Sequence, residues 1–310
     1  MSAKNLSSLR TAVIGVGYLG RFHAQKHKTL GTLKFICDAS AERAVERGKE
    51  LGVESTSSYE SLLGKVDAVT IAADTTSHYK VAEFFLKNGV HTLVEKPITV
   101  KVEEGEKLVA LARKNSLVLQ VGHIERFNPV FVHGQKLIQK PRYVELQRLA
   151  PFKTRSLSVD VILDLMIHDI DLARAYTKAK LKDFSAAGVR IFSDYNDWAQ
   201  AHLYFEDGFH ANMIVSRADS QSVRKITVVD QDRVLTLDLG GTSIQIAEKS
   251  DDPAQPLKLG TVTVDKFDAL LAETESFFNS IVSGAPVQVT GEDGLEALRI
   301  AELVMKKIKG

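Results

Sequence analysis

Asp164 and His168 are the residues of this chain whose types and spacing most directly suggest acid–base chemistry. They stand four positions apart in the apolar segment VDVILDLMIHDIDLARAY, so a helix places them on one face. An acid inside so apolar a helix is costly unless it lines a cavity or bonds a neighbour. A histidine held by a carboxylate can transfer a proton. We therefore expect a helix over 162–178 that presents an oriented acid–base pair, with a structural histidine as the alternative.

Lys96 is the second candidate, in the stretch LVEKPITV. The apolar run is typical of a buried parallel strand, but it ends in Glu95 and Lys96. Pro97 has no N–H with which to extend a strand ladder. Because open α/β sheets bind ligands at the carboxyl ends of their strands, Lys96 is placed to act on a ligand. A solvated charge pair on the way into a loop fits the local sequence equally well.

Three glycines form a dinucleotide-binding pattern near the start of the chain. Gly15, Gly17 and Gly20 have G-x-G-x-x-G spacing, follow the apolar run TAVIGV and open a helical pattern. The first glycine permits the tight turn, the second lets backbone approach a pyrophosphate, and the third lets helix and strand pack closely. The helix N-terminus then offers free N–H groups and a positive dipole end.

Asp38 follows Gly20 by 18 residues, at the end of the next predicted strand. An acid about 20 residues after the glycines accepts hydrogen bonds from the ribose hydroxyls and repels a 2′-phosphate, so NAD is favoured over NADP. Arg43 could compensate for such a phosphate. The alternative role for Asp38 is to cap the helix that starts near Ser40.

Charged and polar side chains also gather in VGHIERFNP, where the predicted fifth strand ends. We expect a domain junction here, which is a favoured place for a ligand pocket. Arg126 can bind an anionic substrate group through two parallel hydrogen bonds. An ion pair with Glu125 or another acid is the alternative.

The order of predicted elements changes near residue 125. Before it, strands alternate with helices, which is typical of a parallel sheet with crossover helices. After it, alternating polar and apolar runs predict a largely antiparallel sheet, with a hairpin at Asp207-Gly208. We expect domains at 1–125 and 126–310, with closing helices near 267–283 and 293–308 that can pack back on the first domain. The predicted strands of the first domain are 11–16, 33–38, 68–73, 91–96 and 117–122, and its helices 19–29, 40–51, 78–89 and 102–114.

Composition excludes several classes of partner. The chain has 310 residues, 44% apolar and 25% charged, with a net charge of +1, so it offers no large basic field to a nucleic acid. No apolar run approaches the roughly 20 residues that span a bilayer, and the first residues have no apolar signal segment. We expect a cytoplasmic protein without a membrane partner. Cys37 cannot form an internal disulfide and is expected to be buried.

Together these motifs resemble the glucose-fructose oxidoreductase, inositol dehydrogenase and MocA (Gfo/Idh/MocA) family. The resemblance covers nearly the whole chain and depends on the order of GVGYLG, Asp38, EKP at 95–97, RFNP at 126–129, the Asp164/His168 pair and the closing segments ESFFNSIVSG and VTGEDGLEALRIAE. It implies an α/β fold: an N-terminal Rossmann domain with a doubly wound parallel sheet, then an α+β domain with a large open, mostly antiparallel sheet. It also implies a homodimer or homotetramer formed through that sheet.

The resemblance further implies an enzyme that transfers a hydride between a secondary hydroxyl of a sugar and NAD. His168, held by Asp164, takes the hydroxyl proton, and Lys96 stabilises the charge that develops on the oxygen. The EKP proline, Pro97, is expected to be cis. VGHIERFNP and DLMIHDIDLA resemble the branch that acts on nucleotide sugars such as UDP-N-acetylglucosamine, oxidised at C3. Lys153 and Arg155 suit a diphosphate.

The expected site has a cofactor part and a substrate part, and the chain departs once from the family pattern. No second histidine or cysteine lies at ligand spacing near His168, so no metal site is expected. Asp74 stands where many members have a proline. The expected cofactor contacts are Gly15, Val16, Gly17, Tyr18, Leu19, Gly20, Asp38, Arg43, Ala73, Thr75, His78, Glu95 and Lys96. The expected substrate contacts are Lys96, His123, Arg126, Asn128, Asp164 and His168.

Two other functions remain compatible with the sequence. One is a dehydrogenase of free sugars or inositols, since the basic residues that suit a diphosphate can also be solvated loop charges. The other is a non-catalytic dinucleotide sensor, because fold alone does not fix function. The presence of Lys96, Asp164 and His168 together argues against a sensor, which needs no proton acceptor.

Overall fold

The computed structural model describes residues 6–153 and 159–309, and these divide into two compact units. The first unit comprises residues 1–124 and 268–296, and the second comprises 125–267 and 297–310. The first division falls near residue 125, and the segment 268–296, which includes the first of the two closing helices, groups with the first unit. Arg155, expected near a substrate diphosphate, lies outside the described residues.

Within its described residues, the first unit contains a six-stranded parallel sheet in the order β3-β2-β1-β4-β5-β6. The chain runs from β1 outward to β3 and then returns to pair β4 with the other side of β1. The order therefore reverses at β1, which is where doubly wound sheets bind ligands. The strands are β1 (Thr11–Ile14), β2 (Leu33–Cys37), β3 (Glu54–Thr56), β4 (Ala68–Ile71), β5 (His91–Glu95) and β6 (Leu119–Gly122).

The crossover helices are close to those predicted from the sequence. α2 begins after Ser40, whose side chain accepts a hydrogen bond from the Arg43 N–H, and it ends at Gly52 with φ +68°. These are the cap residues that helices favour. The three-residue β3 was not predicted, and α3 begins three residues earlier than expected. The helices are α1 (Gly20–Thr29), α2 (Ala41–Leu51), α3 (Thr75–Lys87) and α4 (Val102–Lys114).

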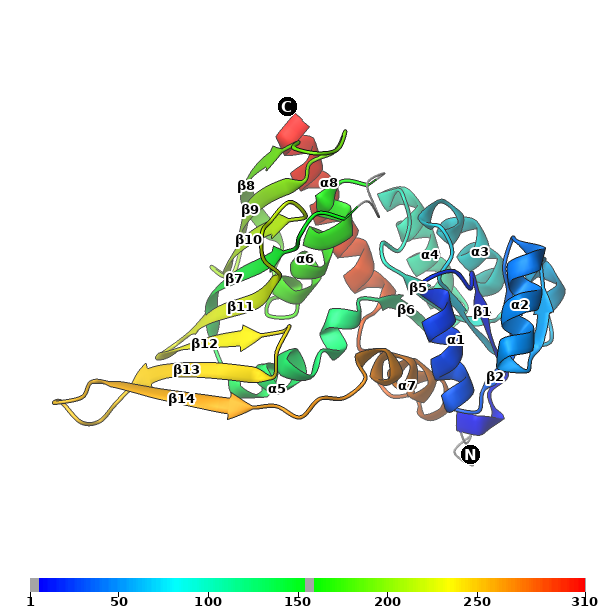
Figure 1. The fold of residues 1–310 in the computed structure, drawn as a ribbon, viewed down its shortest axis with the longest axis horizontal. Coiled ribbons are helices and arrows are strands. Elements are labelled where there is room, and N and C mark those ends of the chain that lie inside the picture. The colour runs from blue at the N-terminus through cyan, green and yellow to red at the C-terminus, as the bar shows by residue number, and fades with distance from the viewer. Residues whose placement is uncertain (1–5, 154–158, 310) are drawn as a thin grey trace. The chain divides into compact units, whose positions relative to one another are not determined.

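Helix α7 (Ala269–Ser283) lies against α1 in the first unit, far from it in sequence (Figure 1). Phe277 and Phe278 are fully buried in a cluster with Leu9, Ala68 and Leu93. Burying each such side chain contributes about 1.5–3 kcal/mol. This packing explains why the segment 268–296 belongs to the first unit.

The second unit contains, within its described residues, an eight-stranded sheet in the order β14-β13-β12-β11-β7-β10-β9-β8. Only β7 and β10 pair in parallel, and the other pairs are antiparallel, as the family resemblance implied. The Asp207-Gly208 hairpin between β9 and β10 is confirmed, with Gly208 at φ +83°. The strands are β7 (Pro141–Leu149), β8 (Leu181–Val189), β9 (Trp198–Phe205), β10 (His210–Ser216), β11 (Val223–Asp230), β12 (Arg233–Asp238), β13 (Ser243–Lys249) and β14 (Leu257–Thr263).

One face of this sheet is covered by helices and holds the core of the second unit. Buried and half-buried residues alternate strictly along β9 and β10, as the period of two demands. The buried set packs against α5 (Pro129–Leu137), which was not predicted, against α6 (Ile167–Arg174), and against the part of α8 (Gly291–Lys309) from Ala297 onward. In the part of the chain that the structure describes, no helix is long and apolar enough to cross a membrane.

The helix predicted over 162–178 differs from a regular α-helix. Its first turn, Ile162–Met166, is a π-helix, and α6 continues to Arg174. The Asp160 carboxylate accepts hydrogen bonds from the Ile162 N–H at 3.1 Å and from the Asn196 amide at 2.8 Å, and so fixes the start of this turn. Asp164 lies in the π-turn and His168 in α6, so the four positions that separate them span a change of helix type. Apolar periodicity cannot distinguish these two kinds of turn.

Candidate active site

The three glycines form the turn that the sequence predicted. Gly15 has φ +83°, and a Cβ there would lie 2.6 Å from the backbone of Ala73. A Cβ on Gly20 would lie 1.7 Å from the Gly15 carbonyl oxygen, so only glycine allows helix α1 to approach β1 this closely. Gly17 has open space beyond its Cα. The turn thus leaves room for a ligand at the backbone of Gly17 and at the N-terminus of α1.

Asp38 follows β2 and stabilises the glycine turn by hydrogen bonding. Its buried carboxylate accepts hydrogen bonds from the Val16 N–H and the Ser40 N–H, each at 2.9 Å. Arg43 lies 3.3 Å from both carboxylate oxygens. The N-cap of α2 is Ser40, so the alternative role for Asp38 as the helix cap is wrong.

A cleft of about 550 Å³ opens between the glycine turn and the ends of β1, β2 and β4. Gly15, Gly17 and Asp38 line one side, and Ala73 and Asp74 line another. A neighbouring cleft of similar volume is lined by Arg21, Arg43 and Arg47. The backbone donors, the carboxylate and the space fit the pyrophosphate and ribose of a dinucleotide. Val16 and Tyr18, two of the expected cofactor contacts, line the clefts too.

His78, expected to contact the cofactor, lies buried between two carbonyl groups. Its Nδ1 is 2.9 Å from the Pro97 oxygen and its Nε2 is 3.1 Å from the Ala73 oxygen. Burial lowers the pKa of His78, although both carbonyl groups favour the charged ring. The ring therefore ties the segment after β4 to the segment after β5. Thr75 is the first residue of α3, and Asp74 is its N-cap.

Lys96 directly follows β5, and its side chain is half-buried. The Lys96–Pro97 peptide bond is cis, as the family resemblance implied. The Lys96 N–H donates to Glu95 Oε2 at 3.2 Å, and Glu95 Oε1 is 2.7 Å from His23 Nε2. Glu95 was expected to contact the cofactor, but its carboxylate is buried and engaged within the protein.

Arg126, in the second unit, is engaged by an acid. Its guanidinium donates to both Asp171 oxygens, at 2.7 and 3.1 Å, and the residue is 8% exposed. This geometry favours the ion pair, with Asp171 as the partner rather than Glu125. Asn128 caps α5 by accepting a hydrogen bond from the Val130 N–H and donates to the Leu239 carbonyl at 3.1 Å. Both residues were expected to contact the substrate, and both make these bonds within the protein.

A second buried group of ion pairs uses Glu125 and Asp169, which are close in sequence to the Arg126–Asp171 pair. Arg148 donates to Glu125 Oε1 at 2.7 Å and to Asp169 Oδ1 at 2.8 and 2.9 Å. Burial acts to raise the pKa of Glu125, but Arg148 and Arg224 hold that pKa below its usual value. For Asp169 burial prevails and its pKa is raised, despite Arg148.

The acids of the 159–176 segment are thereby divided into two groups. Asp160, Asp169 and Asp171 are buried and bonded to Asn196, Arg148 and Arg126. Asp164 and His168 are only half-buried. Among the acids and the histidine of this segment, Asp164 and His168 are the two that solvent reaches. His123 is fully buried at the end of β6, and Lys153 is exposed.

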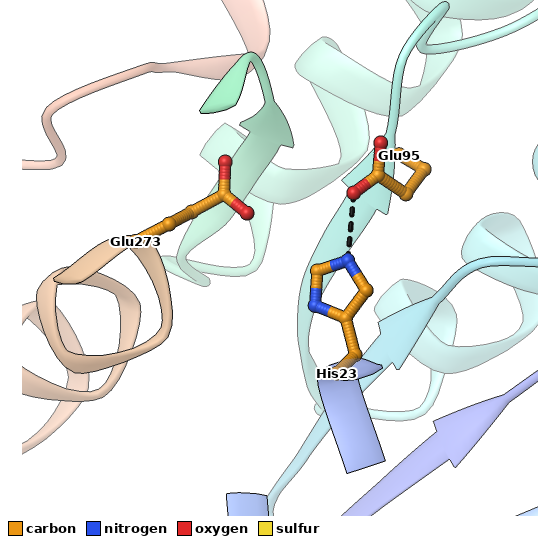
Figure 2. A group of neighbouring side chains, drawn as sticks. All are labelled: His23, Glu95 and Glu273. Atoms are coloured by element: carbon orange, nitrogen blue, oxygen red, sulfur yellow. Dashed lines mark hydrogen bonds and ion pairs between the residues drawn. The ribbon is translucent and has the colours of Figure 1, made fainter. Parts of the chain in front are cut away.

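His23 and Glu273 are among the buried titratable residues that the sequence analysis did not single out. His23 lies on the buried face of α1 and Glu273 on that of α7, and Figure 2 shows both directed toward Glu95. A signal was present, because each stands at helical spacing within an apolar stripe, where a charged residue is unusual.

A glycine turn on the first strand, an acid after the second, and a lysine after the fifth define a dinucleotide-dependent oxidoreductase. Two family models match this chain. Residues 9–123 match the oxidoreductase family with an NAD-binding Rossmann fold, and residues 129–232 match the GFO/IDH/MocA C-terminal domain. The protein belongs to the Gfo/Idh/MocA oxidoreductase family and has its NAD-binding domain.

Two relatives show how similar its members are. UDP-N-acetylglucosamine 3-dehydrogenase of Acidithiobacillus ferrooxidans is 41% identical over 297 residues, which cover 94% of this chain and 95% of that protein. A solved structure of that enzyme matches with a TM-score of 0.93 at 40% identity over 97% of each chain. The scyllo-inositol 2-dehydrogenase (NAD(+)) of Bacillus subtilis is 32% identical, over 64% of each chain.

Replacing Asp38 with serine should weaken the preference for NAD over NADP. The change removes the charge expected to bind the ribose hydroxyls and to repel a 2′-phosphate, and it releases Arg43. A hydrogen bond to a charged group contributes about 1.5–3 kcal/mol, so the ratio of kcat/KM for NAD to that for NADP should fall by about tenfold or more.

The ratio is the measurement, because loss of the bond to the Val16 N–H would affect both cofactors alike. Asp183→Ser, at an exposed position in the second unit, is the matched control and should leave the ratio unchanged. An unchanged ratio in Asp38→Ser would show that Asp38 does not distinguish the ribose hydroxyls of NAD from the 2′-phosphate of NADP.

Proposed function

We propose that this protein is an NAD-dependent dehydrogenase that oxidises the C3 hydroxyl of UDP-N-acetylglucosamine. The observation that carries this is its likeness to one enzyme along nearly its whole length, at 41% identity in sequence and a TM-score of 0.93 in structure. The inositol dehydrogenase of B. subtilis is less similar and matches over a shorter part of the chain. A family fold alone would not select a substrate.

In the proposed reaction His168 accepts the proton of the substrate hydroxyl. Lys96 donates a hydrogen bond to the same oxygen and stabilises the negative charge that develops there. NAD, when bound, supplies the hydride acceptor. Asp38 and the glycine turn hold the dinucleotide, and Asp164 orients His168. The half-buried positions of Asp164 and His168 and the place of Lys96 after β5 support these roles.

The ion pairs of the second unit narrow the search for diphosphate-binding residues. Because Arg126 is held by Asp171, it serves as a support and does not bind phosphate in this proposal. Lys153 is exposed, and Arg224 is more than half exposed with its guanidinium 3.7 Å from Glu125. Among the described residues, we select these two cations as candidates for contact with the diphosphate.

A substrate panel tests the proposal. NADH formation should be measured with UDP-N-acetylglucosamine, N-acetylglucosamine and myo-inositol, each with NAD. A site that pairs a diphosphate loses several charge-assisted hydrogen bonds with the free sugar, so kcat/KM should be at least about a hundredfold higher for the nucleotide sugar. Faster turnover of myo-inositol would support an inositol dehydrogenase. Binding of NAD without turnover of any alcohol would support a sensor.

Lys96→Ala and His168→Ala test the assigned roles. Each should lower kcat by about two orders of magnitude or more, because removing a general base or an electrostatic stabiliser typically costs that much. The Kd of NAD, measured by calorimetry, should change little. Lys101→Ala, at the exposed N-cap of α4, and His133→Ala, in α5, are matched controls that remove a lysine and a histidine elsewhere. Turnover close to wild type in either test variant would refute that residue's role.

We also propose that the protein forms a homodimer or homotetramer through the face of the eight-stranded sheet that helices do not cover. Half-buried aromatic and imidazole rings gather there, with His202 and Tyr204 stacked at 4.4 Å and His210 4.8 Å from Tyr204. Such rings are enriched at interfaces. Tyr204→Glu should shift the mass measured by light scattering toward the monomer, whereas Tyr195→Glu, in an exposed loop, should not. A monomeric wild-type protein would contradict this.

A further inference from the structure

Three titratable side chains from distant parts of the sequence meet inside the first unit (Figure 2). His23 comes from α1, Glu95 from the end of β5, and Glu273 from α7. His23 Nε2 is 2.7 Å from Glu95 Oε1. One ring nitrogen of His23 and one carboxyl oxygen from each glutamate all lie within 4.8 Å of one another. His23 and Glu273 are fully buried, and Glu95 is 6% exposed.

Several polar atoms of this cluster have no hydrogen-bond partner among the described residues. They are both carboxyl oxygens of Glu273, Nδ1 of His23 and Oε1 of the neighbouring Gln120. Gln120 donates its amide N–H to the Glu273 backbone carbonyl at 3.1 Å, which holds the two residues together. Buried polar groups are rarely left in this state, so a proton, a water or an ion must satisfy these atoms.

The charges that face the cluster do not neutralise two carboxylates. Lys96, on the Glu95 side, acts to lower the pKa of Glu95. Nearby titratable neighbours are the imidazoles of His27 and His78, and burial lowers the pKa of each of these. Gln120, from β6, is uncharged. An ionised Glu273 would therefore be a buried charge without a counter-ion, which costs several kcal/mol and shifts the group toward its neutral form.

The two carboxyl groups are in different environments. Burial acts to raise the pKa of Glu95, but the hydrogen bond to His23 and the charges beside it hold that pKa below its usual value. For Glu273, burial and then the charge of Glu95 raise the pKa well above its usual value. Neighbouring carboxyl groups with pKa values pushed apart carry different numbers of protons at neutral pH.

We propose that Glu273 is a neutral carboxylic acid whose proton holds the Glu95 carboxylate in place, and that His23, Glu95 and Glu273 together position Lys96. The inference rests on the proposed role of Lys96 in catalysis. A protonated Glu273 gains an O–H donor, and one bridging water or a small rotation spans the distance to Glu95 or to His23 Nδ1.

Glu95 transmits this constraint to the proposed catalytic lysine. Its Oε2 accepts the Lys96 backbone N–H at 3.2 Å, so the carboxylate fixes the peptide from which the Lys96 side chain projects. The carboxyl group also lies flat on Gly122, where a Cβ would be 2.7 Å from the Glu95 carboxyl carbon. Displacement of Glu95 therefore displaces the backbone of Lys96, and a misplacement of about 1 Å can cost about a hundredfold in rate.

A divalent cation is the competing occupant. One imidazole and two carboxylates form a plausible ligand set for zinc or a similar metal, and such an ion would satisfy the Glu273 oxygens with both acids ionised. The two occupants make opposite predictions about Glu273, which must carry a proton in one case and must lose it in the other.

The kinetic test compares two substitutions at Glu273. Glu273→Gln keeps a neutral side chain with donors and should retain kcat within about threefold of wild type. Glu273→Leu removes the donor and should lower kcat by about tenfold or more, with the KM for NAD little changed, because the effect acts through Lys96. Glu275→Gln, half-buried on the same helix, is the matched control. Equal losses in Glu273→Gln and Glu273→Leu would overturn the proposal.

The stability test has a sign that follows from the direction of the pKa shift. A group whose pKa is raised by folding contributes stability below its unfolded pKa, and that stability is lost as pH rises through the folded pKa. Wild type should therefore lose more stability than Glu273→Gln as pH rises from the ordinary glutamate pKa of 4.5 through neutral pH, as measured by urea unfolding. An identical dependence in both proteins would overturn the neutral state of Glu273.

Infrared spectroscopy decides the protonation state without using activity. In protein labelled with 13C at glutamate carboxyl groups, wild type and Lys96→Ala should both show the carbonyl band of a protonated carboxyl that Glu273→Gln lacks. If Glu273→Gln does not fold, wild type alone must show the band. Its absence, or one equivalent of divalent metal in the purified protein by mass spectrometry, overturns the inference. Full activity in Lys96→Ala with the band present would instead refute only the proposed function.

Discussion

Arg148 lies buried between the carboxylates of Glu125 and Asp169. Much of the structure depends on the need to pair or neutralise buried charges such as these. A charge taken out of water must be paired or neutralised, and breaking a buried pair by removing one partner costs about 3–5 kcal/mol. Arg148 therefore ties β7 to α6 and to the segment before α5. The Arg126–Asp171 pair adds a second tie between that segment and α6. Helix α6, which carries His168, is held by ionic contacts as well as by its apolar face.

In the first unit a buried carboxyl group is neutralised by a proton and not by a basic side chain. His23 and Glu95 form a close pair, but Glu273 adds a second carboxyl group without adding a cation. A buried acid in that position satisfies the constraint by holding a proton. The ion pairs of the second unit and the carboxyl pair of the first thus have one physical origin. In both cases side chains outside the reacting centre fix the backbone that presents a proposed catalytic residue.

The dinucleotide site illustrates how one side chain can serve structure and binding together. Asp38 accepts a hydrogen bond from the glycine turn and borders the cleft that fits a dinucleotide. Its burial and its bonds to two backbone N–H groups fix the carboxylate in one orientation before a ligand arrives. Preorganisation of this kind reduces the entropy that binding must otherwise overcome.

The sequence by itself determined the parts of this protein that depend on local spacing. The glycine turn, the acid after the second strand, the order of strands and helices, the Asp207-Gly208 hairpin and the place of Lys96 at a strand end all follow from residues within about 20 positions of one another. Such patterns act through the backbone geometry of a single turn, strand or helix, so they can be inferred before the chain is folded.

Only the tertiary structure decided which charged side chains meet. Arg126 pairs with Asp171, 45 positions away, and His23 pairs with Glu95, 72 positions away. No local rule selects these partners, because each buried acid could in principle be satisfied by several bases and the packing of helices on sheets makes the choice. The sequence could not predict the π-turn at Ile162–Met166, because it too depends on a distant contact. Its apolar pattern is that of a helix, and contacts of Asp160 with a distant asparagine fix where the turn begins.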